Sequence, residues 1–169
     1  MKSLAKSLVM DLKVIDNFLP KQYFRQIKDL MMSANFPWYY NDGVIFEGDG
    51  QYQFTHNFFN SQTDICSEFI TLFEIFFEML GVKNLHRVKA NLNTRTSFNE
   101  KTGYHYDYPD MRTAVFYVND NNGGTEFKNG KFVKSKENRI VIFDSNLIHT
   151  GVTCNDEKMR VVVNFNYEH

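Results

Sequence analysis

The pattern that most constrains the fold lies in residues 87–167, where short apolar segments alternate with turn residues. In RVKANLNTRT (87–96), Val88, Ala90 and Leu92 alternate with polar residues, as in a strand with one buried face. Further strand-like segments follow without a helical pattern between them: RTAVFYVN (112–119), TEF (125–127), RIVIFD (139–144) and MRVVVNFNY (159–167), with the hairpin signal Asn129-Gly130 inside FKNGKFV. Short strands without intervening helices predict an antiparallel sandwich or barrel.

Two segments before this region show helical periodicity. After Pro20, the segment KQYFRQIKDLMMSA repeats apolar residues at helical spacing. Residues 62–80 carry a broad apolar face, and Gly81 is placed to end that helix. The members of this face are Ile65, Phe69, Leu72, Phe73, Phe76 and Met79. We expect both helices to cover one face of a sheet.

Residues 34–60 are aromatic and rich in turn residues. We expect short strands and a flap here, with Trp38, Tyr39 and Tyr40 either in a lid over a substrate or in the core. His56, inside QFTHNFF, is interpreted as a structural histidine near the core. The 169 residues include 17 Phe, enough for one phenylalanine-rich core, so we expect a single domain. It would comprise a helical and aromatic part (1–84) and a strand-rich part (85–169).

Charge and cysteine content narrow the classes of function. The formal net charge is −1 and the basic residues form no stripe, so nucleic acid is not an expected partner. Cys66 and Cys154 match no CxxC spacing, which suggests a reducing compartment. Lysines interrupt the apolar residues of the N-terminus, and neither a signal peptide nor a membrane span is expected there. These features predict a cytoplasmic protein without a membrane partner.

The residues best suited to chemistry are two histidines and an aspartate. His105 and Asp107 are two residues apart, so in an extended segment their side chains leave the same face. His149 follows the strand-like segment 139–144. Two imidazoles and one carboxylate can occupy one face of an octahedral metal and leave three positions open, as in non-haem Fe(II) oxygenases.

Arg160 opens the last strand-like segment and suits a different task. A guanidinium is always charged and can bind a carboxylate through two hydrogen bonds, which would fix the far end of a dicarboxylic cosubstrate such as 2-oxoglutarate. If Arg160 faces inward, Val162, Asn164 and Asn166 do so too, and Asn164 could bind the cosubstrate or a metal-bound water. Tyr117 is a weaker candidate for the same carboxylate. Arg112 would either meet substrate at the pocket mouth or lie on the surface.

These residues carry a resemblance to the Fe(II)/2-oxoglutarate-dependent dioxygenase superfamily, particularly its prolyl 4-hydroxylase-like branch, which includes small phage-encoded members. The matching pieces are HYD (105–107), FYVN (116–119), GGTEF (123–127), RIVIFD (139–144), His149 and RVVVNFNY (160–167), with RVKANL (87–92) as a looser match. The resemblance covers about the last half of the chain. It implies a mainly β fold with supporting α-helices, a double-stranded β-helix, which is a distorted, cupin-like jelly roll with its core in residues 85–169.

The resemblance also implies roles for individual residues. His105, Asp107 and His149 would bind iron, Arg160 would bind the C5 carboxylate of 2-oxoglutarate, and Tyr117 would share that carboxylate. Many prolyl 4-hydroxylases have lysine where Arg160 stands, and some have tyrosine where this chain offers Asn91 or Asn93. The implied reaction consumes 2-oxoglutarate and O2, hydroxylates an unactivated C–H, and releases succinate and CO2, with ascorbate as a reductant. A prolyl residue of a peptide or protein is the implied substrate.

Several alternatives share parts of this pattern. The same chemistry could act on a free amino acid or another protein side chain. An oxidative nucleobase demethylase resembles RxNxxxxR at the last strand, but Arg160 and Asn164 are followed by no second arginine. A non-catalytic jelly-roll module would have no need for all four residues, and in a cupin-type metal site without 2-oxoglutarate Arg160 would have no cosubstrate role.

Overall fold

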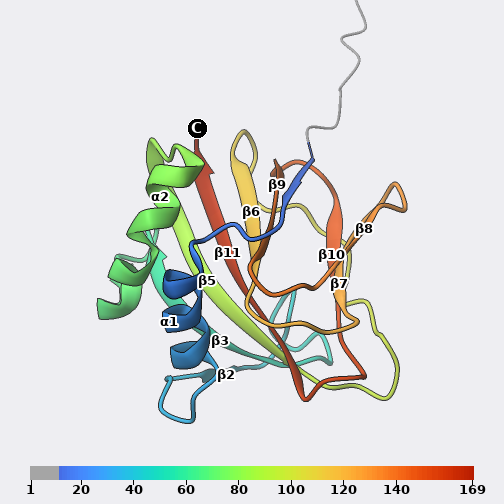
Figure 1. Cartoon of the computed structure of the whole chain (residues 1–169). Helices are drawn as coiled ribbons and strands as arrows, with labels where there is room; N and C mark the ends of the chain where they lie inside the picture. Colours follow the sequence, from blue (N-terminus) through green and yellow to red (C-terminus); the bar gives the residue numbers. More distant parts are fainter. Residues whose placement is uncertain (1–11) are drawn as a thin grey trace, which may run out of the picture.

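The computed structural model describes residues 12–169 (Figure 1). The prediction that the N-terminus contains neither a signal peptide nor a membrane span falls largely on residues 1–11, which lie outside the described residues. Between residues 12 and 169, no helix has both the length and the apolar character needed to cross a membrane.

The described residues form two β-sheets. The large sheet has the strand order β1-β9-β6-β11-β5-β3-β2, and β4 pairs with β3. All of its pairings are antiparallel. Its strands are β1 (Lys13–Ile15), β2 (Tyr39–Asn41), β3 (Gln53–Asn60), β4 (Ile65–Cys66), β5 (Asn84–Thr94), β6 (Arg112–Tyr117), β9 (Arg139–Asp144) and β11 (Met159–Glu168). Four of these strands come from the first 83 residues.

The small sheet has the order β10-β7-β8 and lies against the face of the large sheet that is opposite the two helices (Figure 1). Its strands are β7 (Gly124–Phe127), β8 (Phe132–Lys134) and β10 (His149–Val152). The turn between β7 and β8 contains Asn129-Gly130, as the sequence predicts, and Gly130 adopts a positive φ of 87°. This two-sheet arrangement with helices on one side is the predicted jelly roll.

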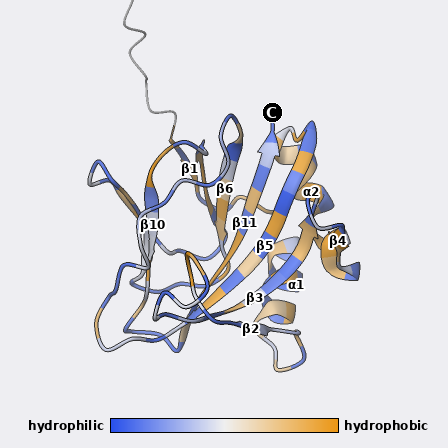
Figure 2. Cartoon of the chain, turned by 180° about the vertical axis from the view of Figure 1, so that it is seen from behind, coloured by the Kyte–Doolittle hydropathy of each residue, from blue (hydrophilic) through white to orange (hydrophobic). Residues whose placement is uncertain are grey.

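Two helices cover the outer face of the large sheet (Figure 1). They are α1 (Lys21–Met31) and α2 (Glu74–Leu80). Alternation along the strands decides which side chains they cover, and it is visible as orange and blue bands on β5 in Figure 2. On β11, Val161, Val163 and Phe165 point into the helix-covered core, where Phe76 stacks on Phe165 at a ring separation of 4.8 Å. A second apolar cluster fills the space between the two sheets, with Tyr117, Phe127 and Phe143 among its buried members.

The helix predicted over residues 62–80 is shorter than its apolar periodicity suggests. Residues 65–66 pair with β3 as β4, Glu68–Phe73 form a 3₁₀ helix, and only Glu74–Leu80 are α-helical. Ser67 explains the start, because its hydroxyl accepts a hydrogen bond from the backbone N–H of Phe69 and so caps the 3₁₀ turn. The predicted end is confirmed, since Gly81 has the left-handed conformation of a C-cap.

The change of helix type also changes the buried face. Phe73 and Phe76 are fully buried as predicted, but Ile65 and Met79 are exposed and Leu80 is buried instead. Three residues per turn in the first segment and 3.6 in the second rotate the face relative to one continuous α-helix. The expected position of Met79 in the core is therefore wrong.

The aromatic stretch 34–60 is divided between core and pocket. Trp38 packs edge-on against Phe36 and donates a hydrogen bond from Nε1 to the carbonyl of Met31. Tyr39 and Tyr40 are exposed on the edge strand β2. The loop after β2 approaches the opposite face of the sheet, where Val44 and Ile45 line the pocket described below.

Candidate metal centre

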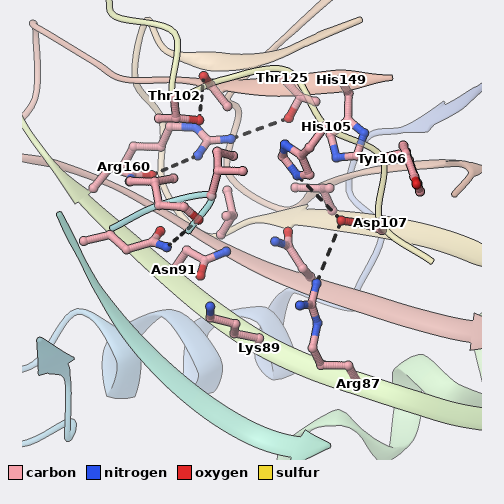
Figure 3. Close-up of a pocket in the computed structure, with 18 of the residues that line it drawn as sticks. Arg87, Lys89, Asn91, Thr102, His105, Tyr106, Asp107, Thr125, His149 and Arg160 are labelled. Atoms are coloured by element: carbon pink, nitrogen blue, oxygen red, sulfur yellow. Dashed lines mark hydrogen bonds and ion pairs between the residues drawn. The ribbon is translucent and has the colours of Figure 1, made fainter. Parts of the chain in front are cut away.

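A pocket of about 360 Å³ opens between the large and small sheets on the side opposite the helices. Its floor consists of the pocket-facing side chains of β5 and β11, and its rim includes Thr102, residues 105–108 and part of β10 (Figure 3). The four residues singled out for metal and cosubstrate, His105, Asp107, His149 and Arg160, all line it.

A backbone bridge brings the two histidines together. His105 and His149 are 44 positions apart, yet each donates its N–H to the carbonyl of the other over 2.9 Å. A similar bond from the N–H of Asp107 to the carbonyl of Ser145 continues the contact. The segment that carries HxD is therefore held against β10 and the turn before it, and both rings project into the pocket with centroids 4.6 Å apart.

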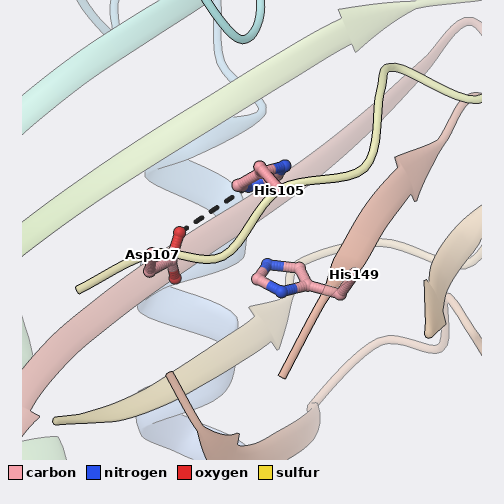
Figure 4. Close-up of side chains that lie close together, drawn as sticks. All are labelled: His105, Asp107 and His149. Atoms are coloured by element: carbon pink, nitrogen blue, oxygen red, sulfur yellow. Dashed lines mark ion pairs between the residues drawn. The ribbon is translucent and has the colours of Figure 1, made fainter. Parts of the chain in front are cut away.

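One ligand atom from each of His105, Asp107 and His149 lies within 4.8 Å of the others (Figure 4). In His105, Nδ1 lies 3.1 Å from the carbonyl of Gly103, and in His149, Nδ1 lies 2.8 Å from the carbonyl of Leu147. A carbonyl only accepts hydrogen bonds, so in each neutral ring the proton is on Nδ1 and Nε2 keeps its lone pair. The two Nε2 atoms and the Asp107 carboxylate form a donor set suited to a metal ion with positions left open for other ligands.

The Asp107 carboxylate is held by hydrogen bonds from two strands, β6 and β11. Oδ2 accepts hydrogen bonds from Thr113 Oγ1 at 2.8 Å and from Asn166 Nδ2 at 3.0 Å, while Oδ1 lies 3.6 Å from His105 Nε2. Burial raises the pKa of Asp107, but the charges of His149 and Arg87 and these hydrogen bonds outweigh it and leave the pKa below its usual value. Asp107 is therefore an anionic candidate ligand at neutral pH.

His149 is buried, and this burial lowers the pKa of its imidazole, although Asp107 acts in the opposite direction. The lowered pKa favours the neutral ring, which is the form that binds metals. Phe143 packs edge-on against the ring with centroids 4.8 Å apart, so rotation of the imidazole is restricted. The position of His149 and its neutral form are therefore those that a metal ligand requires.

The face of β11 that turns toward the pocket is the one predicted. Arg160, Val162 and Asn164 line the cavity, and Asn166 reaches Asp107. Arg160 is buried and makes two long hydrogen bonds, from Nη1 to Asn93 Oδ1 at 3.3 Å and from Nη2 to Thr125 Oγ1 at 3.5 Å. Its Nε and the Oδ1 of Asn164 are buried without a hydrogen-bond partner in residues 12–169. Unpartnered polar atoms in a cavity favour a polar ligand there.

Two other candidates occupy different surroundings. Tyr117 lies beneath Arg160, whose guanidinium carbon is 5.8 Å from the ring centroid, and its hydroxyl donates to Thr125 Oγ1 at 2.7 Å. Tyr117 therefore packs against Arg160 and does not line the cavity. Arg112 is at the start of β6, where its neighbour Thr113 faces Asp107 and alternation turns Arg112 to the other side; there it hydrogen bonds Tyr167.

Sequence reasoning missed the pocket-facing side of β5. Arg87, Lys89 and Asn91 line the cavity between the candidate metal ligands and Arg160 (Figure 3). The signal was present, because the residues that alternate with buried Val88 and Ala90 must share the opposite face. What the alternation leaves open is whether that opposite face meets solvent or a second layer. His56 is structural as interpreted, with its ring nitrogens bound to the carbonyl of Pro37 and to Ser67 Oγ.

Solved structures with a similar architecture include 2-oxoglutarate-Fe(II) oxygenases. A prolyl-4-hydroxylase from Pseudomonas putida aligns with a TM-score of 0.66 at 15% identity, covering 95% of this chain and 94% of its own. A prolyl hydroxylase from Trichoplax adhaerens, solved with a hypoxia-inducible-factor peptide fragment, gives a TM-score of 0.63 at 13% identity over 95% and 84% of the two chains. HygX from Streptomyces hygroscopicus, solved with nickel and 2-oxoglutarate, gives 0.65 at 10% identity over 94% and 83%.

The sequence matches no protein-family model, and no curated protein matches it. At these identities the structural likeness establishes the fold alone. The chain therefore has the fold of 2-oxoglutarate-Fe(II) oxygenases, including prolyl 4-hydroxylases.

Proposed function

We propose that this protein is an Fe(II)- and 2-oxoglutarate-dependent dioxygenase that hydroxylates an unactivated C–H. The observation that supports this most strongly is one pocket with two features. A His-Asp-His donor set lies within 4.8 Å, and a buried arginine with an unpartnered Nε lies in the same cavity. A purely structural arginine would have a closer set of acceptors, since an unpaired buried charge costs several kcal/mol.

The donor set fits Fe(II) in number, kind and orientation. His105 and His149 would bind through Nε2 because backbone carbonyls hold their Nδ1 atoms, and Asp107 would bind as the carboxylate. With 2-oxoglutarate and O2, the iron would supply the oxidation, giving hydroxylated product, succinate and CO2. Ascorbate is the reductant that we expect to maintain activity.

The protein's own contribution is orientation. Arg160 would bind the C5 carboxylate of 2-oxoglutarate through its guanidinium, with the Tyr117 ring packed against the arginine. Asn164, which also lines the pocket, would donate a hydrogen bond from Nδ2 to the cosubstrate. Asn166 and Thr113 hold the Asp107 carboxylate in place. The pocket lies between two sheets, so bound ligands exclude water from the site.

For the substrate, we propose a prolyl residue of a peptide or protein first, because prolyl hydroxylases share the fold. A free amino acid is the second candidate, and the cationic lining of the pocket favours it. Arg112 contacts Tyr167 on the other face of β6 and does not line the pocket, so we propose no substrate contact for it.

The test is anaerobic titration of the protein with Fe(II) and then 2-oxoglutarate, monitored by the weak visible charge-transfer band of the iron chelate. We expect the band in the wild type, its loss in His105→Ala, and a requirement for much more 2-oxoglutarate in Arg160→Lys. The conservative variant keeps the buried charge but not the forked geometry. His169→Ala, at the exposed C-terminal residue, is the matched control and leaves the band unchanged.

A wild type that binds Fe(II) but shows no band would contradict the proposal and favour a cupin-type metal site or a non-catalytic module. A band with an unchanged 2-oxoglutarate requirement in Arg160→Lys would contradict only the cosubstrate role of Arg160.

A further inference from the structure

Lys89 is the one cationic side chain of the pocket that has no partner among residues 12–169. Its place on β5 puts it between Val88 and Ala90, both fully buried, so its side chain leaves the opposite face and lines the cavity. No hydrogen bond or ion pair joins its ammonium to another described residue, and Figure 3 shows it reaching up from β5 without a dashed line. A partly buried ammonium without a partner calls for an explanation.

The other two cations of the pocket are already engaged. Arg87 donates from Nε to Asn166 Oδ1 at 3.0 Å, lies 3.9 Å from Asp107 Oδ1 and stacks over Tyr108. Arg160 is held by Asn93 and Thr125 at the far end. Arg87 therefore supports the metal ligand and Arg160 suits the cosubstrate, which leaves Lys89 without a role in either.

The carboxylates near Lys89 do not neutralise it. Among the described residues, Asp107 is the only acidic one that lines the pocket, and it points to the candidate metal centre and is hydrogen bonded to Thr113 and Asn166. Asp42 and Glu47 line an adjoining hollow that Lys89 also borders, but neither forms an ion pair with it within 4.0 Å. Three cations thus face one carboxylate, and the charges of bound Fe(II) and doubly ionised 2-oxoglutarate would cancel each other.

Two side-chain amides whose oxygens have no hydrogen-bond partner in residues 12–169 flank Lys89. Asn164 is its direct cross-strand partner on β11, and Asn91 is two residues farther along β5 on the same face. The Oδ1 atoms of both are buried without a hydrogen-bond partner in the described part of the chain. Cβ atoms of directly opposite residues are about 5 Å apart, so one small group can contact the Lys89 ammonium and the Asn164 amide together.

From these contacts we propose that Lys89 binds a carboxylate of the substrate, with Asn91 and Asn164 accepting hydrogen bonds from a donor next to that carboxylate. The inference rests on the proposed function and narrows its substrate class to a free amino acid or a peptide with a free C-terminal carboxylate. The substrate would be hydroxylated at a carbon held toward the metal. A pocket of about 360 Å³ is near the lower end of the usual range, which suits a small acid beside 2-oxoglutarate.

The ionisation of Lys89 is consistent with this role. Burial and the nearby charge of Arg87 lower the pKa of Lys89 to about 8, and Asp107 offsets this only in part. A bound carboxylate would supply the missing counter-charge, so the ligand and the charged form of Lys89 would stabilise each other.

The experiment measures binding without turnover. Protein loaded with Zn(II) and saturating 2-oxoglutarate is titrated with the common free L-amino acids, L-proline included, and with their carboxamides, and the rise in Tm is recorded. A second arm uses N-acetyl dipeptides with free or amidated C-termini, which separates a free amino acid from a chain end. Succinate formation with Fe(II) under air is then measured for each compound.

We expect at least one free acid to raise Tm and to stimulate succinate formation, and its amide to bind about tenfold or more weakly. Lys89→Met should lose a similar factor for the acid and little for the amide, and Lys89→Arg should restore part of it. Lys83→Met, at an exposed lysine just before β5, is the matched control and leaves acid binding unchanged.

Three results would overturn the inference: binding of no acid by the wild type, equal binding of acid and amide, or equal acid binding by wild type and Lys89→Met. The iron chelate band separates this failure from failure of the proposed function. If Lys89→Met weakened the band's response to 2-oxoglutarate instead, Lys89 would bind the cosubstrate and the inference would be wrong.

Discussion

Asn166 Nδ2 donates a hydrogen bond to Asp107 Oδ2 over 3.0 Å, while Asn166 Oδ1 accepts one from Arg87 Nε over 3.0 Å. One fully buried amide on the last strand therefore orients a candidate metal ligand and connects it to a cation of β5. The Asp107 carboxylate depends on a residue 59 positions away for its position.

This relationship predicts a metal-binding defect in Asn166→Ala. Loss of the Nδ2 donor leaves Asp107 less well oriented, and loss of such outer partners typically weakens metal binding about 10- to 100-fold. Isothermal titration with Zn(II) or Mn(II) measures the change. Asn146→Ala, in an exposed turn, serves as control. Equal metal affinity of Asn166→Ala and wild type, with both folded, would show that Thr113 alone suffices to hold the carboxylate.

Lys89→Met should stabilise the protein near neutral pH in the absence of ligands. The folded-state pKa of Lys89 is about 8 against 10.5 for a free lysine, so below pH 8 the fold bears the cost of a buried charge. Each pKa unit corresponds to about 1.4 kcal/mol, and we expect a gain of about 1 to 3 kcal/mol in the free energy of unfolding at pH 7.

The sign of the pH dependence distinguishes this effect from better packing. Wild-type Lys89 loses its proton as pH rises from 8 to 10.5, so the advantage of Lys89→Met should shrink over that window. Urea unfolding at pH 7, 9 and 10.5 measures it. An advantage that is constant with pH would mean that the methionine side chain, not the removed charge, is responsible.

The contribution of Asp16 to stability should have the opposite pH dependence. Hydrogen bonds from Arg139 and Lys136 hold the pKa of the Asp16 carboxyl well below 3.8, its ordinary value. The stabilisation is therefore complete above pH 3.8 and is lost as pH falls through the lower folded-state pKa. Asp16 is exposed, so Asp16→Asn should lower the free energy of unfolding by only about 0.5 to 1 kcal/mol at pH 7, and by less in high salt. Chemical unfolding at pH 7 with and without 1 M NaCl checks this; a salt-independent loss would contradict the electrostatic origin.

The helix-covered core predicts unequal effects of two neighbouring substitutions. Phe76 is fully buried, with its ring 4.8 Å from that of Phe165 and 4.9 Å from that of Phe116, so Phe76→Ala should cost about 3 to 5 kcal/mol. Met79 is 46% exposed, and Met79→Ala should change stability by less than about 0.5 kcal/mol. Thermal and urea unfolding of both variants test the observed helix face. A large cost at Met79 would instead support one continuous helix over residues 62–80.

The local pattern of the sequence was sufficient for the strands of the second half. Strand periodicity of two and turn residues such as Asn129-Gly130 are short-range properties, so RIVIFD emerges as β9 with unchanged bounds and β11 keeps its predicted alternation. The residues His105, Asp107, His149 and Arg160 were likewise recognisable from type, order and spacing. Their assigned roles in binding metal and cosubstrate stay predictions.

Long-range contacts decided the rest. The helix over 62–80 was overestimated because pairing of β4 with β3 and the Ser67 cap compete with its helical periodicity. No role was predicted for the polar side of β5, which includes Lys89, because no nearby residue reveals that a second sheet covers that face.

The sequence by itself determined which side chains are available for chemistry and which face of each strand they occupy, because both follow from residue type and a period of two. Only the tertiary structure decided which faces meet. The bridge between His105 and His149 joins residues 44 positions apart, and the register of β11 against β5 sets Asn164 opposite Lys89. Such contacts depend on the packing of two sheets as a whole, a property that no local pattern of residues encodes.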